Sequence, residues 1–184
     1  MPLLFARRRP IWKAGIWNDF LNELKEGRDG GPPGYRNSGK SVSKAVSWAL
    51  KTKLNSCGTA GADEPCRMSV FSAISPWAEA IMFRSASDLS RNNVRITSVD
   101  FNPCVLEGIP SNAIAECLST LDLVHHGSGP QLDLTVSYSG IEHDGLGRYG
   151  DPVNPNGDVG AMREMWLLTR PGGVLLVSFR TPIR

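Results

Sequence analysis

Apolar residues recur with helical spacing in the first part of the chain. Between residues 11 and 26 they fall every three or four positions, with lysine and glutamate between them, which predicts an amphipathic helix. Two prolines and several glycines over residues 27–34 end it. A second helix is predicted to begin at Ser41 or Ser43, either of which could cap it. A polar linker over residues 55–65 follows.

The rest of the chain alternates between strand and helix patterns. Four short apolar or β-branched runs are typical of strands. They cover residues 68–74, 94–101, 132–138 and 174–179. Helical patterns occupy residues 76–86 and 158–168, whereas residues 104–129 are less regular. This alternation predicts a Rossmann-like α/β fold with a mostly parallel sheet of about four to five strands and flanking helices, and ligands in such folds bind beyond the carboxyl ends of the strands.

The charges divide the chain into two parts. Residues 1–56 carry 11 Lys and Arg against 4 Asp and Glu, whereas residues 57–184 carry 9 against 14. We therefore predict a basic helical extension over the first part and the α/β domain over the second. A basic extension could meet nucleic acid or anionic lipid. Its charges are scattered, however, and lack the aromatic pattern of an RNA-binding sheet, so a solvated basic face is favoured over nucleic-acid binding.

The apolar runs and the cysteines of the chain indicate its cellular compartment. No run approaches the roughly 18 apolar residues of a membrane span, and the N-terminus lacks the order and length of a secretory signal. The four cysteines lack the spacing of a zinc site and are too sparse for a disulfide scaffold. We therefore expect reduced thiols, no metal, no membrane association and a cytoplasmic location. The cysteines are Cys57, Cys66, Cys104 and Cys117.

A phosphate-binding pattern occurs once. Gly34, Gly39, Lys40 and Ser41 fit the spacing of a P-loop, in which backbone amides at a helix start converge on phosphate. A working P-loop follows a buried strand, and residues 26–33 with their glycines and prolines cannot form one. A glycine-rich loop that leads into a helix is therefore favoured over a nucleotide-hydrolysing site.

Two segments after predicted strands carry candidate chemistry. Asp100 at a strand tip could accept hydrogen bonds from both ribose hydroxyls of a nucleotide-type cofactor, or could form a turn. The polar loop over residues 137–158 follows the next strand. In it, His143 beside a carboxylate could act as a general base, and Glu142, His143 and Asp151 could equally bind a metal. The remaining alternative is a self-bonded loop whose acids cap the next helix at Asp158.

Asp100, residues 134–143 and the Pro-Gly-Gly turn within residues 168–177 together resemble S-adenosylmethionine-dependent methyltransferases of the Rossmann-like class. A closer resemblance, over residues 35–178, is to the family called domain of unknown function 268. The segments that carry it are Ile74-Ser-Pro-Trp77-Ala-Glu79-Ala80, Thr97-Ser-Val-Asp100-Phe-Asn102-Pro103 and Ser137-Tyr-Ser-Gly-Ile-Glu142-His143-Asp-Gly-Leu-Gly-Arg148-Tyr149-Gly-Asp151-Pro.

The resemblance implies roles for individual residues. His143 or Asp144 would remove a proton from the acceptor. S-adenosylmethionine would be held by Ser72, Ala73, Ser75, Asp100, Phe101, Asn102, Ser137 and Glu142. The acceptor, a small molecule or a glycan of unknown identity, would meet Arg148, Tyr149 and Asp151.

The chain departs from the methyltransferase pattern at two places. Side chains and a proline occupy residues 72–76, where methyltransferases place a G-x-G turn that lets the backbone approach the cofactor. We also expect the fold to be truncated after the fifth methyltransferase strand, with a sheet edge that a partner or a second copy in a homodimer could cover. Two hypotheses therefore stand, a methyltransferase and a non-catalytic Rossmann-like binding module.

Overall fold

A five-stranded parallel sheet forms the centre of the molecule. The computed structural model describes residues 9–32, 34, 37–119, 122, 132–148 and 150–179. All neighbouring strands of the sheet run parallel, in the order β5-β3-β2-β6-β7. This confirms the predicted Rossmann-like α/β class. The strands are β2 (Cys66–Phe71), β3 (Val94–Asp100), β5 (Glu116–Ser119), β6 (Leu132–Tyr138) and β7 (Thr169–Ser178).

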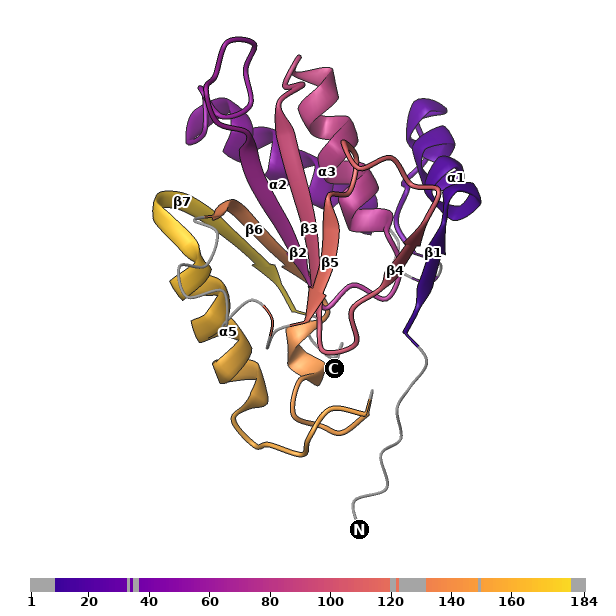
Figure 1. Ribbon diagram of the computed structural model, residues 1–184, viewed down its shortest axis with the longest axis vertical. Helices are drawn as coiled ribbons and strands as arrows, with labels where there is room; N and C mark the ends of the chain where they lie inside the picture. Colours follow the sequence, from indigo (N-terminus) through magenta and orange to yellow (C-terminus); the bar gives the residue numbers. More distant parts are fainter. Residues whose placement is uncertain are drawn as a thin grey trace.

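Helices cover both faces of the sheet (Figure 1). The helices α2 and α3 pack against each other on one face, and α1 packs against α3. The opposite face carries α5, which contacts β7. None of the described helices combines the length and the apolar character that a membrane crossing needs. Their bounds are α1 (Ala14–Lys25), α2 (Ser38–Thr52), α3 (Trp77–Asp88), the short 3₁₀ helix η1 (Ile141–His143) and α5 (Gly157–Leu168).

The alternation of side chains along the strands divides the core into two layers. Met68 and Val70 of β2 belong to the larger cluster, which includes the buried residues of α2 and α3. Phe71 and Val99 belong to the smaller one, where they meet Met165 of α5. Because successive side chains of a strand point to opposite faces, a sheet covered on both sides needs apolar residues on both.

The beginning of the described chain differs from the predicted helix over residues 11–26. Residues 11–13 form β1 (Ile11–Lys13), which pairs in parallel with β4 (Val105–Glu107), and α1 starts only at Ala14. Trp12 is 2% exposed and lies in the larger core cluster. Its partner strand is about 90 residues away, so the helical spacing of the apolar residues alone could not indicate the pairing.

Two further strand predictions were incomplete. The less regular segment over residues 104–129 contains β4 and β5, which are too short to show a pattern. The last strand begins at Thr169 instead of Val174, because the Pro-Gly-Gly turn is a bulge within β7: Leu132 pairs with Thr169 and Leu134 already pairs with Val174. Gly172 there has a φ of 79°, which favours glycine.

The cysteines correct the expectation of reduced thiols. Cys57 is bonded to Cys66 and Cys104 to Cys117, with Cα–Cα distances of 4.9 and 5.4 Å. Strand packing brings these residues together although they are sparse along the chain, and both distances suit a disulfide. Disulfides are typical of oxidising compartments. The inference from cysteine spacing to a cytoplasmic location therefore loses its basis.

Candidate functional site

The carboxyl ends of β2 and β6 mark the point where the strand order reverses. From β2 the chain builds β3 and β5 on one side and then β6 and β7 on the other. Parallel α/β folds bind ligands in the crevice at such a point. A cavity of about 110 Å³ lies there, between the turn after β2, the start of α3, the end of β6 and Pro32. Three of the residues predicted to hold a cofactor line it, Ser72, Ala73 and Ser75.

Ser72 takes a backbone conformation that glycine usually adopts. Its φ is 60°, in the left-handed region that costs a residue with a β-carbon roughly 1–2 kcal/mol. Its amide donates to the carbonyl of Val99 at 2.8 Å. Gly140 lies against it, since a β-carbon at Gly140 would come within 2.6 Å of the Ser72 β-carbon. The turns after β2 and β6 can meet because residue 140 has no side chain.

Aromatic residues form one wall of the cavity. The rings of Trp77 and Tyr138 meet edge to face with centroids 5.3 Å apart, and both residues line the cavity. Trp12 donates from its indole Nε1 to the carbonyl of Ile74 at 3.2 Å. The segment around β1, far away in sequence, therefore helps to hold the turn that follows β2.

Asp100 ends β3, the strand beside β2, and is half-buried. Its Oδ1 accepts a hydrogen bond from the amide of Asn102 at 2.8 Å, so it does form a turn. Burial raises the pKa of Asp100, the Asn102 amide opposes the rise, and the Asp151 carboxylate adds to it. Phe101, also predicted to meet the cofactor, is 42% exposed. The turn-forming role leaves the second carboxylate oxygen of Asp100 available for a ligand.

The segment after β6 forms η1, whose side chains are held by short contacts. The Ser139 hydroxyl donates to Oε1 of Glu142 at 2.6 Å. The other oxygen of Glu142 is buried and has no hydrogen-bond partner within the described residues. The same holds for the hydroxyl of Ser137, which is 1% exposed within β6. The sequence predicted both residues as cofactor ligands, and each has an unsatisfied oxygen.

The remaining loop is largely bonded to itself. Oδ2 of Asp151 accepts from the amides of Gly145 at 2.7 Å and Gly147 at 3.1 Å. The Asn154 amide donates to the carbonyl of Gly145 at 2.8 Å. The self-bonded alternative therefore describes this loop. The helix α5 begins at Gly157, one residue before the predicted position, and Oδ1 of Asp158 accepts from the first-turn amide of Val159 at 2.8 Å. Of the predicted acceptor-binding residues, Arg148 is exposed and Tyr149 lies outside the described residues.

Asp144, one of the two predicted catalytic residues, has a strongly perturbed carboxyl group. Burial raises its pKa to about 7, and the carboxylates of Asp100, Asp151, Glu164 and Glu142 add to the rise. The structure thus gathers acids from β3, η1, the following loop and α5 around one half-buried carboxyl. A group with a pKa near neutrality can exchange a proton at physiological pH, and a concentration of acids favours a cationic ligand. For His143, the other candidate base, the structure gives a position in η1 next to Asp144.

Glu79 is a buried acid that the sequence did not single out by its chemistry. It lies in the first turn of α3, is fully buried, and neither carboxylate oxygen makes a hydrogen bond within the described residues. Burial raises its pKa to about 7; the backbone amide of Glu79 and the nearby Ser98 hydroxyl oppose the rise, and Asp100 adds to it. The sequence did offer a signal for its burial. Glu79 stands among the apolar residues Ala78, Ala80 and Ile81 of the predicted helix, and such a position faces a core.

In the P-loop-like segment, a carboxylate of the protein itself accepts hydrogen bonds from the amides at the helix start. Oδ1 of Asp29 accepts from the Lys40 amide at 3.0 Å and Oδ2 from the Gly39 amide at 3.2 Å. A carboxylate thus sits where a P-loop would place phosphate, and it explains why α2 begins at Ser38 rather than at Ser41 or Ser43. The expected glycine-rich loop leading into a helix agrees with this geometry.

The described residues contain one group of three potential metal ligands whose ligand atoms lie within 4.8 Å of one another. It consists of Cys57, Cys66 and Asp133, which lie at the amino ends of the strands, whereas the crevice lies at their carboxyl ends. The acids around Asp144 form no such group among the residues described.

Comparison with known proteins connects this crevice to a family. Neither a curated protein nor a solved structure matches the chain. The sequence profile described as "Caenorhabditis protein of unknown function, DUF268" matches residues 70–183. The match covers more than half of the chain, from the end of β2 onward, and therefore includes Asp100 and the loop after β6. The chain belongs to the DUF268 family of Caenorhabditis proteins of unknown function.

Proposed function

We propose that the protein transfers a methyl group from S-adenosylmethionine to a small-molecule or glycan acceptor. The observation that carries this proposal is the position of Asp100, at the carboxyl end of β3 and directly beside the β2–β6 crevice. In nucleotide-binding α/β folds an acid at the end of the second strand holds the ribose hydroxyls. Counted outward from β2, β3 is that second strand.

The charge of the crevice supports a cationic cofactor. Asp100, Asp144, Asp151, Glu142 and Glu164 lie close enough together to affect the ionisation of one of them. S-adenosylmethionine carries a positive sulfonium and an ammonium group, and supplies an electrophilic methyl group. We assign Asp100 to the ribose and the turn at Ser72 to the methionine portion, with the unsatisfied oxygen of Glu142 as a further acceptor of hydrogen bonds.

Asp144 is the residue to which we assign proton removal. A general base works best when its pKa lies near the working pH, and the pKa of Asp144 is raised to about 7. It would take a proton from an acceptor hydroxyl or amine as the acceptor attacks the methyl group. The bond from that carbon to sulfur would break, and its electron pair would leave with the neutral thioether product. Most of the rate enhancement would come from holding the acceptor in line with that group.

A non-catalytic binding module is the second candidate, and two observations favour it. Ser72 stands with a φ of 60° where methyltransferases use glycine, so its side chain occupies space near the cavity. The cavity of about 110 Å³ is also smaller than the roughly 300–1,000 Å³ of most ligand pockets. A module of this kind would use the same loop to hold a ligand or partner without transferring a group.

Calorimetric titration with S-adenosylmethionine tests the proposal. Asp100→Ala should weaken binding by about 10- to 100-fold, the value of a hydrogen bond to a charged group, whereas Glu107→Ala on exposed β4 should not change it. Absence of binding to the wild-type chain at millimolar ligand would refute the cofactor, and equal binding by Asp100→Ala would refute the role of Asp100. Binding that Asp144→Asn leaves intact, with no methyl transfer to any acceptor by the wild type, would favour the binding module.

A further inference from the structure

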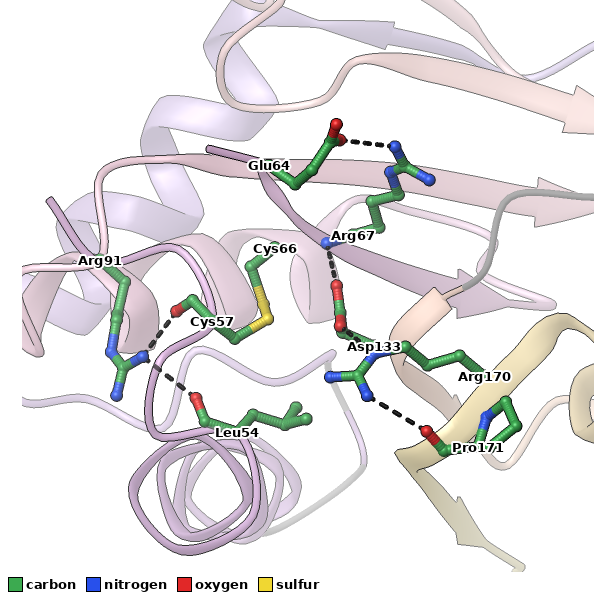
Figure 2. A network of polar contacts seen from close by, with 9 residues as sticks. All are labelled: Leu54, Cys57, Glu64, Cys66, Arg67, Arg91, Asp133, Arg170 and Pro171. Carbon is green, nitrogen blue, oxygen red and sulfur yellow. Dashed lines mark hydrogen bonds and ion pairs between the residues drawn. A yellow bond between two sulfur atoms is a disulfide. The ribbon is translucent and has the colours of Figure 1, made fainter. Parts of the chain in front are cut away.

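The amino end of the sheet carries a cluster of side chains that the proposed function does not use. There the Cys57–Cys66 disulfide lies beside the carboxylate of Asp133 (Figure 2). Both sulfur atoms and a carboxylate oxygen lie within 4.8 Å of one another. Thiolate sulfur and carboxylate oxygen are both ligands of Zn²⁺, and soft sulfur ligands disfavour Mg²⁺ and Ca²⁺.

The two cysteines are held from opposite sides. Cys66 is the first residue of β2, and its amide donates to the carbonyl of Asn93 at 2.8 Å. Cys57 lies in the turn after α2, where Nη1 of Arg91 donates to its carbonyl at 2.6 Å and to that of Leu54 at 3.1 Å. Figure 2 shows the guanidinium of Arg91 reaching both carbonyls. These contacts do not depend on the disulfide, so they would keep the cysteines near each other after its reduction.

The third group, Asp133, lies near the start of β6 and is 9% exposed. Its Oδ2 accepts from the Arg67 amide at 2.8 Å, and its Oδ1 accepts from Nε of Arg170 at 2.5 Å. These bonds fix the carboxylate next to the two sulfurs. They also neutralise its charge in part, so that Arg170 would oppose the binding of a cation there.

We propose that the reduced form of the Cys57–Cys66 pair, together with Asp133, binds Zn²⁺. A dithiol supplies the two electrons and two protons that open the disulfide and is itself oxidised to a disulfide. Zn²⁺ then displaces the two thiol protons, which leave to solvent, and the metal replaces the covalent link between the turn at Cys57 and β2.

The geometry and the charges are compatible with this exchange. Two sulfurs bound to a tetrahedral Zn²⁺ at about 2.3 Å lie roughly 3.8 Å apart. The Cα atoms of Cys57 and Cys66 are 4.9 Å apart in the disulfide. The two residues therefore need to move apart only slightly for both sulfurs to bind one Zn²⁺. Two thiolates and the Asp133 carboxylate carry three negative charges, which balance Zn²⁺ and the Arg170 guanidinium. A water molecule would complete the four ligands.

The second disulfide offers a matched control. Cys104 and Cys117 are also bonded, but they do not belong to a group of three ligands among the described residues. If reduction alone created zinc affinity, both cysteine pairs would bind Zn²⁺. If Asp133 is needed, only Cys57 and Cys66 would bind it.

The experiment measures Zn²⁺ binding to the full chain before and after reduction with a phosphine, by competition with a chromophoric chelator. Co²⁺ serves as a second probe, because thiolate-to-cobalt absorption reports sulfur ligands directly. We expect no binding by the oxidised chain and one Zn²⁺ per reduced chain, both in the wild type and in Cys104→Ser/Cys117→Ser. Cys57→Ser/Cys66→Ser should lose more than the roughly 100-fold in affinity that removal of an outer partner costs.

Two single variants separate a ligand from a structural role. Asp133→Asn should weaken Zn²⁺ binding at least about tenfold, with urea unfolding to check that the chain folds. Arg170→Gln should strengthen it, because an opposing charge is removed; loss of structure would act in the opposite direction. The proposal is overturned if the native disulfide resists reduction, if the reduced wild type binds no more Zn²⁺ than Cys57→Ser/Cys66→Ser, or if Asp133→Asn binds equally well in a folded chain.

Discussion

The buried carboxyl of Glu79 should make the stability of the protein fall as the pH rises. Glu79 is fully buried, and its pKa is raised from 4.5 to about 7. Ionisation is therefore harder in the folded than in the unfolded chain. The stabilising effect of the bound proton is complete below pH 4.5 and is lost as the pH rises to about 7, because only the unfolded chain releases its proton readily in that range.

The magnitude follows from the difference between the two pKa values. At about 1.4 kcal/mol per unit, a rise from 4.5 to about 7 corresponds to about 3 kcal/mol between pH 4.5 and pH 8. Glu79→Gln keeps the shape of the side chain and does not titrate. Relative to the wild type, the variant should thus gain about 3 kcal/mol in free energy of unfolding over this pH range.

Urea unfolding at several pH values between 4.5 and 8 measures this difference. The other carboxylates titrate in both proteins, so their contributions largely cancel when the two curves are subtracted. Glu107→Gln, on exposed β4, is the matched control and should follow the wild type throughout. Parallel curves for the wild type and Glu79→Gln would refute the reasoning, since they would mean that Glu79 titrates alike in the folded and unfolded chains.

Four further variants should have a changed free energy of unfolding, which urea unfolding also measures. Cys104→Ser/Cys117→Ser should lose about 3 kcal/mol, the loop-closure value for a sequence separation of 13; an unchanged midpoint would contradict it. Ser72→Gly should gain about 1 kcal/mol, because it relieves the left-handed backbone at a small cost in chain entropy. Gly140→Ala should lose roughly 1–3 kcal/mol through its clash with Ser72, and wild-type stability would disprove that contact. Asp29→Ala should lose about 1 kcal/mol, the usual value of a helix cap, with loss of α2 helicity by circular dichroism.

Much of the fold could be predicted from the sequence because local periodicity encodes the elements. The alternation of strands and helices after residue 66 predicted the parallel sheet, and with it the carboxyl ends of the strands as the place of the candidate site. The pairing of β1 with β4 and the capping of α2 by Asp29 were missed. Each depends on a partner at a distance along the chain, and no pattern within either segment announces it.

The candidate site divides in the same way. Asp100 and Asp144 were predicted because they follow strands of a parallel sheet, whose carboxyl ends share one edge. The apolar neighbours of Glu79 indicated a position that faces the core, but no pattern within either helix could assign Glu79 or Glu164 to the site. Only the packing of α3 and α5 against the sheet shows that their carboxyls are close to the crevice.

The sequence by itself determined the main alternation of strands and helices, and which polar residues follow the strands. It did not determine the short strands β1, β4 and β5. The tertiary structure decided the strand order, the disulfide partners and the ionisation of the buried acids. The physical reason is the range of the interactions. Side-chain periodicity and turn chemistry act between near neighbours, whereas strand pairing, burial and the repulsion between carboxylates arise only when distant segments such as β3, η1 and α5 are packed together.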